Sequence, residues 1–183
     1  MSQEPDSLVV ALAGRRIDAE GAEERRFPLE NVASVKARLR LAFADAKVRA
    51  LVCSAACGVD LVALEAAGEL GIRRRIVLPT NRAAFRASSV VDRPGAWGEL
   101  FDRVVAEVAA KQDLVTLELG TGDESYRAAN RAILAAAGKL ADLPEAWIVW
   151  NGSPRDPSDI TLHFANEARA QGLSVREFLT VSA

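Results

Sequence analysis

The sequence is poor in the residues that build metal centres and disulfide frameworks. Among its 183 residues it has one histidine, His163, and two cysteines, Cys53 and Cys57. Cys53 falls in an apolar run and Cys57 in the turn after it, an arrangement that argues against a structural disulfide and fits a cytosolic protein. A metal site would need further ligands beside these, so we expect neither a metal ion nor a cofactor.

Long apolar runs and an excess of one charge are also missing. No uncharged apolar run approaches the ~18 residues of a membrane-spanning helix, and the acidic start Met1–Asp6 lacks the basic region of a secretory signal. We therefore expect no membrane association and a cytoplasmic location. The 23 Lys and Arg are balanced by 25 Asp and Glu. This balance argues against bulk binding of nucleic acid, although a local basic groove stays compatible with it.

The common catalytic patterns are absent as well. The sequence contains no Ser-His-Asp, glycosidase-type or P-loop pattern, and His163 is expected to be structural. The stretch Gly120–Ser125 approaches the dinucleotide-binding pattern G-x-G-x-x-G but lacks its third glycine. Its acidic residues Asp123 and Glu124 would repel a pyrophosphate, and Asp123 is predicted to be a helix N-cap. The stretch therefore does not support binding of NAD.

What the sequence does contain is a regular alternation of apolar runs and amphipathic segments. The predicted strands are Leu8–Ala13, Ala50–Ser54, Arg75–Leu78, Leu114–Leu119, Ala146–Trp150 and Val175–Leu179. The predicted helices are Glu30–Lys47, Val59–Leu70, Trp97–Ala110, Glu124–Ala141 and Ser158–Gln171. Continuously apolar strands separated by helices favour a parallel sheet that is covered on both faces. We predict a single α/β domain over residues 1–183, a Rossmann-like doubly wound fold with a mainly parallel sheet of about five to six strands.

Two long connections interrupt the alternation, Arg15–Leu29 and Pro79–Gly95. Both follow predicted strands, so both are expected to overhang the edge of the sheet where such folds bind ligands. The first, which is rich in glutamate, is the one expected to be mobile. From the second we expect Arg82 and Arg86 to close over a ligand.

The most informative stretch is the turn Ser54–Asp60, which joins a predicted strand to a predicted helix. A strand, a tight turn of small residues and a helix N-terminus form an anion site, because free N–H groups and the helix dipole face the turn. We expect a phosphate over this turn, with Ser54, Ala56, Cys57 and Gly58 as its cradle. Two roles are open for Asp60. Its negative charge stabilises the helix through the positive end of the helix dipole, or its carboxylate accepts hydrogen bonds from a ribose hydroxyl or a neighbouring loop.

Position at a helix N-terminus also predicts a lowered pKa for the Cys57 thiol. A spacer role fits Cys57 better than catalysis, because no histidine lies near it in the sequence. The first predicted strand ends in Gly14, Arg15 and Arg16. Either the glycine permits close approach and the arginines clamp a phosphate, or the three form a turn with solvated side chains.

Three further polar residues are predicted near the same edge. Tyr126 and Asn130 share a helix face with apolar residues, and Asn151 follows the fifth predicted strand. Tyr126 is a candidate for stacking on a base. Asn130 needs a partner, which is a backbone carbonyl or the edge of a ligand. We expect Asn151 to contribute a polar group to the pocket.

Taken together, Ala11–Arg16 and Cys53–Asp60 resemble the SLOG superfamily, which includes the DNA-processing protein DprA and the cytokinin-activating "lonely guy" enzymes. Ser54, Ala56, Gly58 and Asp60 fall on the family turn, with Ala55 where glycine is common. The chain is most similar to bacterial stand-alone or signalling-linked members. That similarity extends over Leu78-Pro79, Phe85–Val90, Tyr126, Asn130 and Trp150–Gly152.

The resemblance implies binding of a nucleotide or nucleotide-derived phosphorylated molecule at the carboxyl edge of the sheet, in sensing or signalling. Two alternatives stay open: a hydrolase acting on a nucleoside phosphate through Asp60, Glu65 or Glu118, and single-stranded DNA binding. The Pro-Gly-Gly-x-Gly-Thr-x-x-Glu signature of the cytokinin-activating enzymes is missing, and Glu65 stands where DprA proteins carry a histidine. Signalling-linked members carry a Gly-Gly-Thr motif after the fifth strand, and only its threonine, Thr161, is present here. Whether the chain forms a homo-oligomer is left open.

Overall fold

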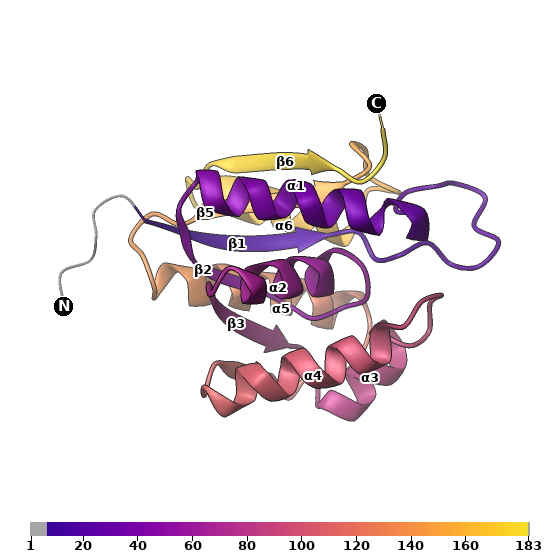
Figure 1. Ribbon diagram of the computed structural model, residues 1–183, viewed down its shortest axis with the longest axis horizontal. Helices are drawn as coiled ribbons and strands as arrows, with labels where there is room; N and C mark the ends of the chain where they lie inside the picture. The colour runs from indigo at the N-terminus through magenta and orange to yellow at the C-terminus, as the bar shows by residue number, and fades with distance from the viewer. Residues whose placement is uncertain (1–6, 183) are drawn as a thin grey trace.

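The computed structural model describes residues 7–182. Its centre is a single sheet with the strand order β4-β3-β2-β1-β5-β6, in which all neighbouring strands are parallel (Figure 1). The strands are β1 (Leu8–Gly14), β2 (Val48–Cys53), β3 (Arg73–Leu78), β4 (Leu114–Thr116), β5 (Glu145–Trp150) and β6 (Val175–Leu179). The predicted Rossmann-like α/β fold is confirmed, with six strands and no antiparallel member within the described residues.

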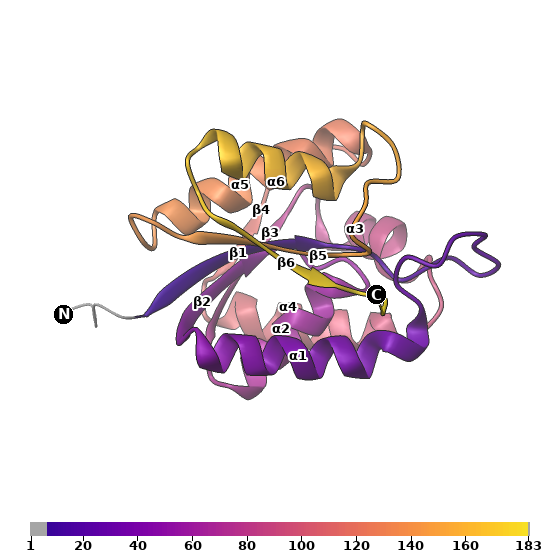
Figure 2. The same ribbon diagram turned by 90° about the horizontal axis from the view of Figure 1, so that it is seen from above.

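Helices cover both faces of the sheet (Figure 2). One face packs against α1 (Val32–Asp45), α2 (Val59–Glu69) and α4 (Trp97–Ala110), and the other against α5 (Asp123–Gly138) and α6 (Ile160–Ala170). Successive side chains of a strand point to opposite faces. Val10 and Leu12 therefore belong to the first core, whereas Val9 and Ala11 belong to the second. This burial on both sides is the reason for the continuously apolar strands.

The direction of strand addition reverses between β1 and β5. The chain adds β2, β3 and β4 on one side of β1, and α5 then crosses the sheet so that β5 pairs with the other side of β1. Gly14 lies opposite Val149 at the carboxyl ends of these two strands, and the Arg15 amide donates to the Val149 carbonyl at 2.9 Å. Folds of this kind bind ligands in the crevice beyond such a reversal.

Three local predictions were wrong. The predicted loop Pro79–Gly95 contains a helix, α3 (Arg82–Ser89), which is capped by Asn81 through its Oδ1 and the Ala84 amide at 2.9 Å. The fourth strand ends at Thr116 instead of Leu119. The N-cap of α5 is Gly122 rather than Asp123, because the chain enters this helix at a φ of +123° that favours glycine.

Within residues 7–182, no helix combines the length and the apolar character needed to cross a lipid bilayer.

Candidate functional site

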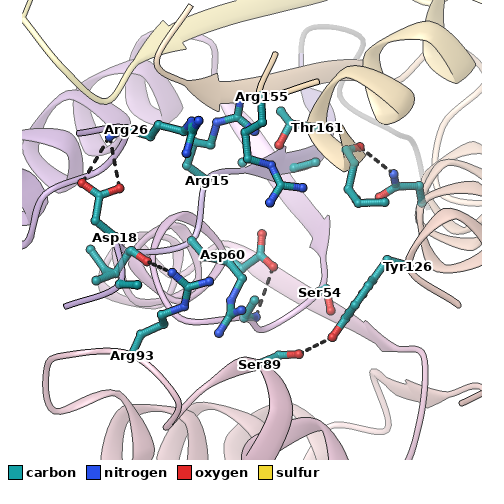
Figure 3. A pocket seen from close by; sticks show the side chains of 18 of the residues that line it. Arg15, Asp18, Arg26, Ser54, Asp60, Ser89, Arg93, Tyr126, Arg155 and Thr161 are labelled. Carbon is teal, nitrogen blue, oxygen red and sulfur yellow. Dashed lines mark hydrogen bonds between the residues drawn. The ribbon is translucent and has the colours of Figure 1, made fainter. Parts of the chain in front are cut away.

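A pocket of about 630 Å³ opens beyond the carboxyl ends of β1 and β2, at the reversal of strand order (Figure 3). Its walls come from five segments: the end of β1 with the following loop, the β2–α2 turn, α3 with the loop after it, the first turns of α5, and the β5–α6 loop. This volume lies within the range of pockets that enclose small molecules, roughly 300–1,000 Å³. Eight of the residues predicted to bind a ligand line it: Gly14, Arg15, Arg16, Ser54, Ala56, Asp60, Tyr126 and Asn130.

The turn after β1 and the turn after β2 are packed directly on each other. Gly58 has a φ of +99°, and a Cβ atom there would lie 2.6 Å from the Arg15 carbonyl oxygen. A Cβ atom on Gly14 would lie 2.6 Å from the Val149 carbonyl oxygen. Both positions therefore require glycine for the contact between chain segments. Gly58 does not line the pocket.

The amides of the β2–α2 turn are largely occupied by the protein itself. The Ala56 amide donates to Asp60 Oδ2 at 3.1 Å, the Cys57 amide to the Ser89 carbonyl at 3.0 Å, and the Val59 amide to the Arg15 carbonyl at 3.0 Å. The expectation that free N–H groups of this turn cradle a phosphate is therefore wrong for these three amides. The turn instead presents the side chains of Ser54 and Asp60 to the pocket.

Asp60 is a buried carboxyl with little compensation for its charge. The residue is 9% exposed, and no ion pair to it occurs within residues 7–182. Burial raises the pKa of Asp60 from 3.8 to about 7, and the Ala56 N–H group and the positive charge of Arg16 oppose this rise only in part. Ser54 Oγ beside it on the turn is also buried, and it has no hydrogen-bond partner among the described residues.

The thiol of Cys57 is buried below Arg16. Burial raises the pKa of Cys57, although Arg16 Nη2 lies 3.5 Å from the sulfur and favours the thiolate. The predicted lowering of this pKa is wrong, because the helix N-terminus is covered by the loop after β1 and not by solvent. Cys57 is absent from the pocket wall, in keeping with the predicted spacer role.

Arg15 is held in place by a buried ion pair. Its Nη1 lies 2.6 Å from Asp159 Oδ2, its Nε donates to Asn151 Oδ1 at 2.8 Å, and its Nη2 donates to the Ser153 carbonyl at 2.7 Å. Asn151 thus orients Arg15 and does not itself line the pocket.

Asp159 also caps α6, accepting from the amides of Thr161 and Leu162 at 2.9 and 3.1 Å. Burial on its own raises the pKa of Asp159, but hydrogen bonds from the Arg155 and Leu162 amides and from Arg15 hold it below its usual value. The ion pair therefore ties the β5–α6 loop to the end of β1.

Arg16 is also engaged, with Asp92 and with the Cys57 sulfur. Two other arginines reach the pocket with weaker attachments. Arg155 is 45% exposed, its Nε lies 3.5 Å from Asp159, and its side chain extends toward the middle of the pocket (Figure 3). Arg93 donates to the Ile17 carbonyl at 3.5 Å and lies 3.8 Å from Asp92.

Neither arginine was predicted as a ligand contact, although Arg155 follows the end of a predicted strand, a placement that could have indicated it. Arg82 and Arg86, which were predicted, lie on α3 outside the pocket wall. Arg86 forms two hydrogen bonds of 2.9 Å with Asp102 of α4.

The pocket wall toward α5 is mainly apolar, with Phe85, Ala129 and Ile133. The Tyr126 hydroxyl lies on this side, 2.6 Å from Ser89 Oγ. Asn130 donates to the Ile160 carbonyl at 3.0 Å, which is the first of the two roles predicted for it. The wall thus combines an apolar surface with a few fixed polar groups, the usual make-up of a small-molecule site.

No protein-family model matches the sequence, and no curated protein is significantly similar to it. The fold and the pocket alone therefore define the class of protein. It is a Rossmann-like α/β protein with an arginine-rich pocket at the reversal of its strand order. Within residues 7–182, no group of three or more His, Cys, Asp or Glu side chains could hold a metal ion.

Proposed function

We propose that the protein binds a nucleotide or a nucleotide-derived phosphorylated small molecule in this pocket. The observation that carries the proposal is the concentration of guanidinium groups around a pocket at the strand-order reversal. Five arginines line it: Arg15, Arg16, Arg26, Arg93 and Arg155. The planar guanidinium group matches the oxygen geometry of a phosphate and can bind it through two hydrogen bonds. The resemblance of the two turns to the SLOG superfamily supports the same class of ligand.

The contacts of these arginines indicate which of them are available to a phosphate. Arg15 is committed to Asp159 and Asn151, Arg16 to Asp92, and Arg26 to Glu24. Arg93 and Arg155 have only long contacts to carboxylates, at 3.8 and 3.5 Å. We therefore assign the phosphate to Arg93 and Arg155, with Arg15 and Arg16 as supports of the pocket wall. This assignment revises the expectation that Arg15 and Arg16 meet the phosphate.

The opposite wall fits the base of such a ligand. Phe85, Ala129 and Ile133 offer apolar surface there, and Tyr126 offers an aromatic ring whose hydroxyl is fixed by Ser89. A base has two apolar faces and a polar edge, which suits a wall of this kind.

A single-stranded nucleic acid fits the pocket less well than a mononucleotide. Proteins that bind single strands combine an extended basic groove with aromatic side chains on which successive bases stack. Here the rim also carries Glu23, Glu24 and Asp123, which would repel a run of phosphates. Single-stranded DNA binding therefore ranks below binding of a small ligand.

Calorimetric titration with nucleoside mono-, di- and triphosphates and cyclic dinucleotides tests the proposal. Arg155→Ala and Arg93→Ala are each expected to weaken binding about 10- to 100-fold, the loss of a charge-assisted hydrogen bond. Arg169→Ala, near the far end of α6, is the matched control and is expected to bind as the unaltered protein does. A folded protein that binds none of these ligands, or whose affinity is unaffected by both pocket variants, contradicts the proposal.

A hydrolase acting on a nucleoside phosphate is the second candidate, and one observation favours it. Asp60 opens into the pocket with a pKa raised to about 7, a value suited to general acid–base catalysis at neutral pH. Incubation with nucleoside monophosphates followed by chromatography decides the matter. Product formation that is lost in Asp60→Asn supports hydrolysis, whereas bound but unchanged nucleotide excludes it for that substrate.

A further inference from the structure

Two side chains of the β2–α2 turn face the pocket with hydrogen-bonding capacity that the protein does not use. Ser54 Oγ is buried and has no partner among the described residues. Asp60 uses one carboxylate oxygen, Oδ2, for the Ala56 amide at 3.1 Å and is 9% exposed. Buried polar groups in folded proteins are nearly always hydrogen-bonded. This pair therefore indicates a place where a ligand completes the bonding.

The chemistry of the pair restricts what the ligand presents there. A carboxylate only accepts hydrogen bonds, and a serine hydroxyl both accepts and donates. A phosphate also accepts and carries the same charge as Asp60, and the amides of Ala56, Cys57 and Val59 are already bonded within the protein. A phosphate at this turn would thus meet the charge of Asp60 without hydrogen bonds from these three amides. Where Asp60 is ionised, above its pKa of about 7, the ligand group opposite it must be an uncharged or cationic hydrogen-bond donor.

The position of the pair selects the sugar among the parts of a nucleotide. In the view of Figure 3, Asp60 lies between Arg93 on one side and Ser54 and Tyr126 on the other, and Arg155 lies above it. A nucleotide has its sugar between phosphate and base. With the phosphate at Arg93 and Arg155 and the base along the wall beside Tyr126, the sugar comes next to Asp60.

We propose that Asp60 and Ser54 bind the vicinal 2′- and 3′-hydroxyls of a ribose, so that the pocket selects ribonucleotides over deoxyribonucleotides. One hydroxyl donates to the carboxylate oxygen that does not serve the Ala56 amide, and the other bonds to Ser54 Oγ. The inference rests on the proposed nucleotide binding and adds to it the specificity-determining residues.

The test compares the four common ribonucleoside 5′-monophosphates with their 2′-deoxy and 3′-deoxy counterparts by calorimetry. Loss of one of these hydroxyls is expected to weaken binding about 10- to 100-fold, because the partner on the protein is left buried and unpaired. In Asp60→Asn, the side-chain oxygen can still accept from the Ala56 amide, but the amide nitrogen presents a donor to the ligand. The affinities of this variant for ribo- and deoxyribonucleotides are therefore expected to differ by less than about threefold.

Ser54→Ala provides a second variant that does not depend on the charge of Asp60. It removes a buried atom without a partner, so thermal unfolding is expected to show undiminished stability while the preference for ribose decreases. Arg155→Ala is the matched control: it is expected to weaken ribo- and deoxyribonucleotides equally and to keep their ratio.

The outcomes separate the two proposals. Equal binding of ribo- and deoxyribonucleotides by the unaltered protein overturns the ribose assignment and leaves nucleotide binding standing. A ribose preference that survives in both Asp60→Asn and Ser54→Ala also overturns the assignment, as does discrimination that follows the amino groups of the base instead of the sugar. Absence of binding for every nucleotide overturns both.

Discussion

The substitution Asp60→Asn is expected to stabilise the folded protein, and to do so more at pH 8 than at pH 5. Burial raises the pKa of Asp60 in the folded protein to about 7, whereas an aspartate in the unfolded chain titrates near 3.9. The folded protein therefore holds the proton more tightly than the unfolded chain does. The stability contributed by this proton is fully present below about pH 4 and is lost as the pH rises through about 7.

The magnitude follows from the difference between the two pKa values. Keeping Asp60 ionised in the folded protein costs about 4 kcal/mol at pH 8, and keeping it protonated at pH 5 costs about 1.5 kcal/mol. The asparagine amide does not titrate, retains an acceptor for the Ala56 amide, and buries N–H groups at a cost of about 1 kcal/mol. We expect a net gain of about 3 kcal/mol at pH 8 and about 0.5 kcal/mol at pH 5.

Urea unfolding of both proteins at the two pH values measures this directly. We expect Asp60→Asn to raise the free energy of unfolding by about 2.5 kcal/mol more at pH 8 than at pH 5. This difference does not depend on the cost of burying the amide, because that cost is the same at both pH values. Asp45→Asn, at an exposed position of α1, is the control and is expected to change stability by less than about 0.5 kcal/mol at either pH. An equal effect of Asp60→Asn at both pH values, or a loss of stability at pH 8, refutes the reasoning from burial.

Three further predictions concern the frame of the pocket. Arg15→Ala leaves the buried Asp159 carboxyl with Arg155 at 3.5 Å as its remaining cation and is expected to lower the free energy of unfolding by about 2–3 kcal/mol; a loss below about 1 kcal/mol in urea unfolding contradicts this. Gly58→Ala, with its φ of +99° and its close approach to the Arg15 carbonyl, is expected to cost more than about 2 kcal/mol. Gly21→Ala, where φ is +71° but nothing lies within 4 Å, is expected to cost only about 1 kcal/mol, and equal losses would show that the contact is unimportant. The buried thiol of Cys57 is expected to react with iodoacetamide at pH 8 at least about 100-fold more slowly in the native protein than in urea, and equal rates contradict the raised pKa.

The fold could be predicted because its signals are local and repeated. The strands β1, β2 and β5 are buried on both faces and are continuously apolar, and α4 carries buried residues at helical spacing from Trp97 to Val108. The helix α3 escaped prediction because only Phe85 and Ser89 are buried in its eight residues. Two positions in a short segment do not establish a period.

The site could be predicted only in part, because its details depend on partners far apart in the sequence. The turn Ser54–Asp60 was identified from its small residues, and it does reach the pocket. Nothing in the neighbouring sequence indicates that the Cys57 amide donates to the Ser89 carbonyl, or that Arg15 forms an ion pair with Asp159. Because of these contacts, the turn does not offer the free N–H groups predicted to bind an anion. It presents the carboxyl of Asp60 and the hydroxyl of Ser54 to the pocket instead.

The most direct test of the central claim is a nucleotide titration followed through the backbone amide signals of the isotope-labelled protein in two-dimensional NMR. Binding in the pocket predicts that the amides of Gly14–Ile17, Ser54–Asp60 and Thr161 shift together and saturate with one dissociation constant. Signals of α4 and of the far end of α6 are predicted to stay in place. Unchanged spectra with every ribonucleotide, or shifts confined to residues away from the carboxyl edge of the sheet, would contradict the account.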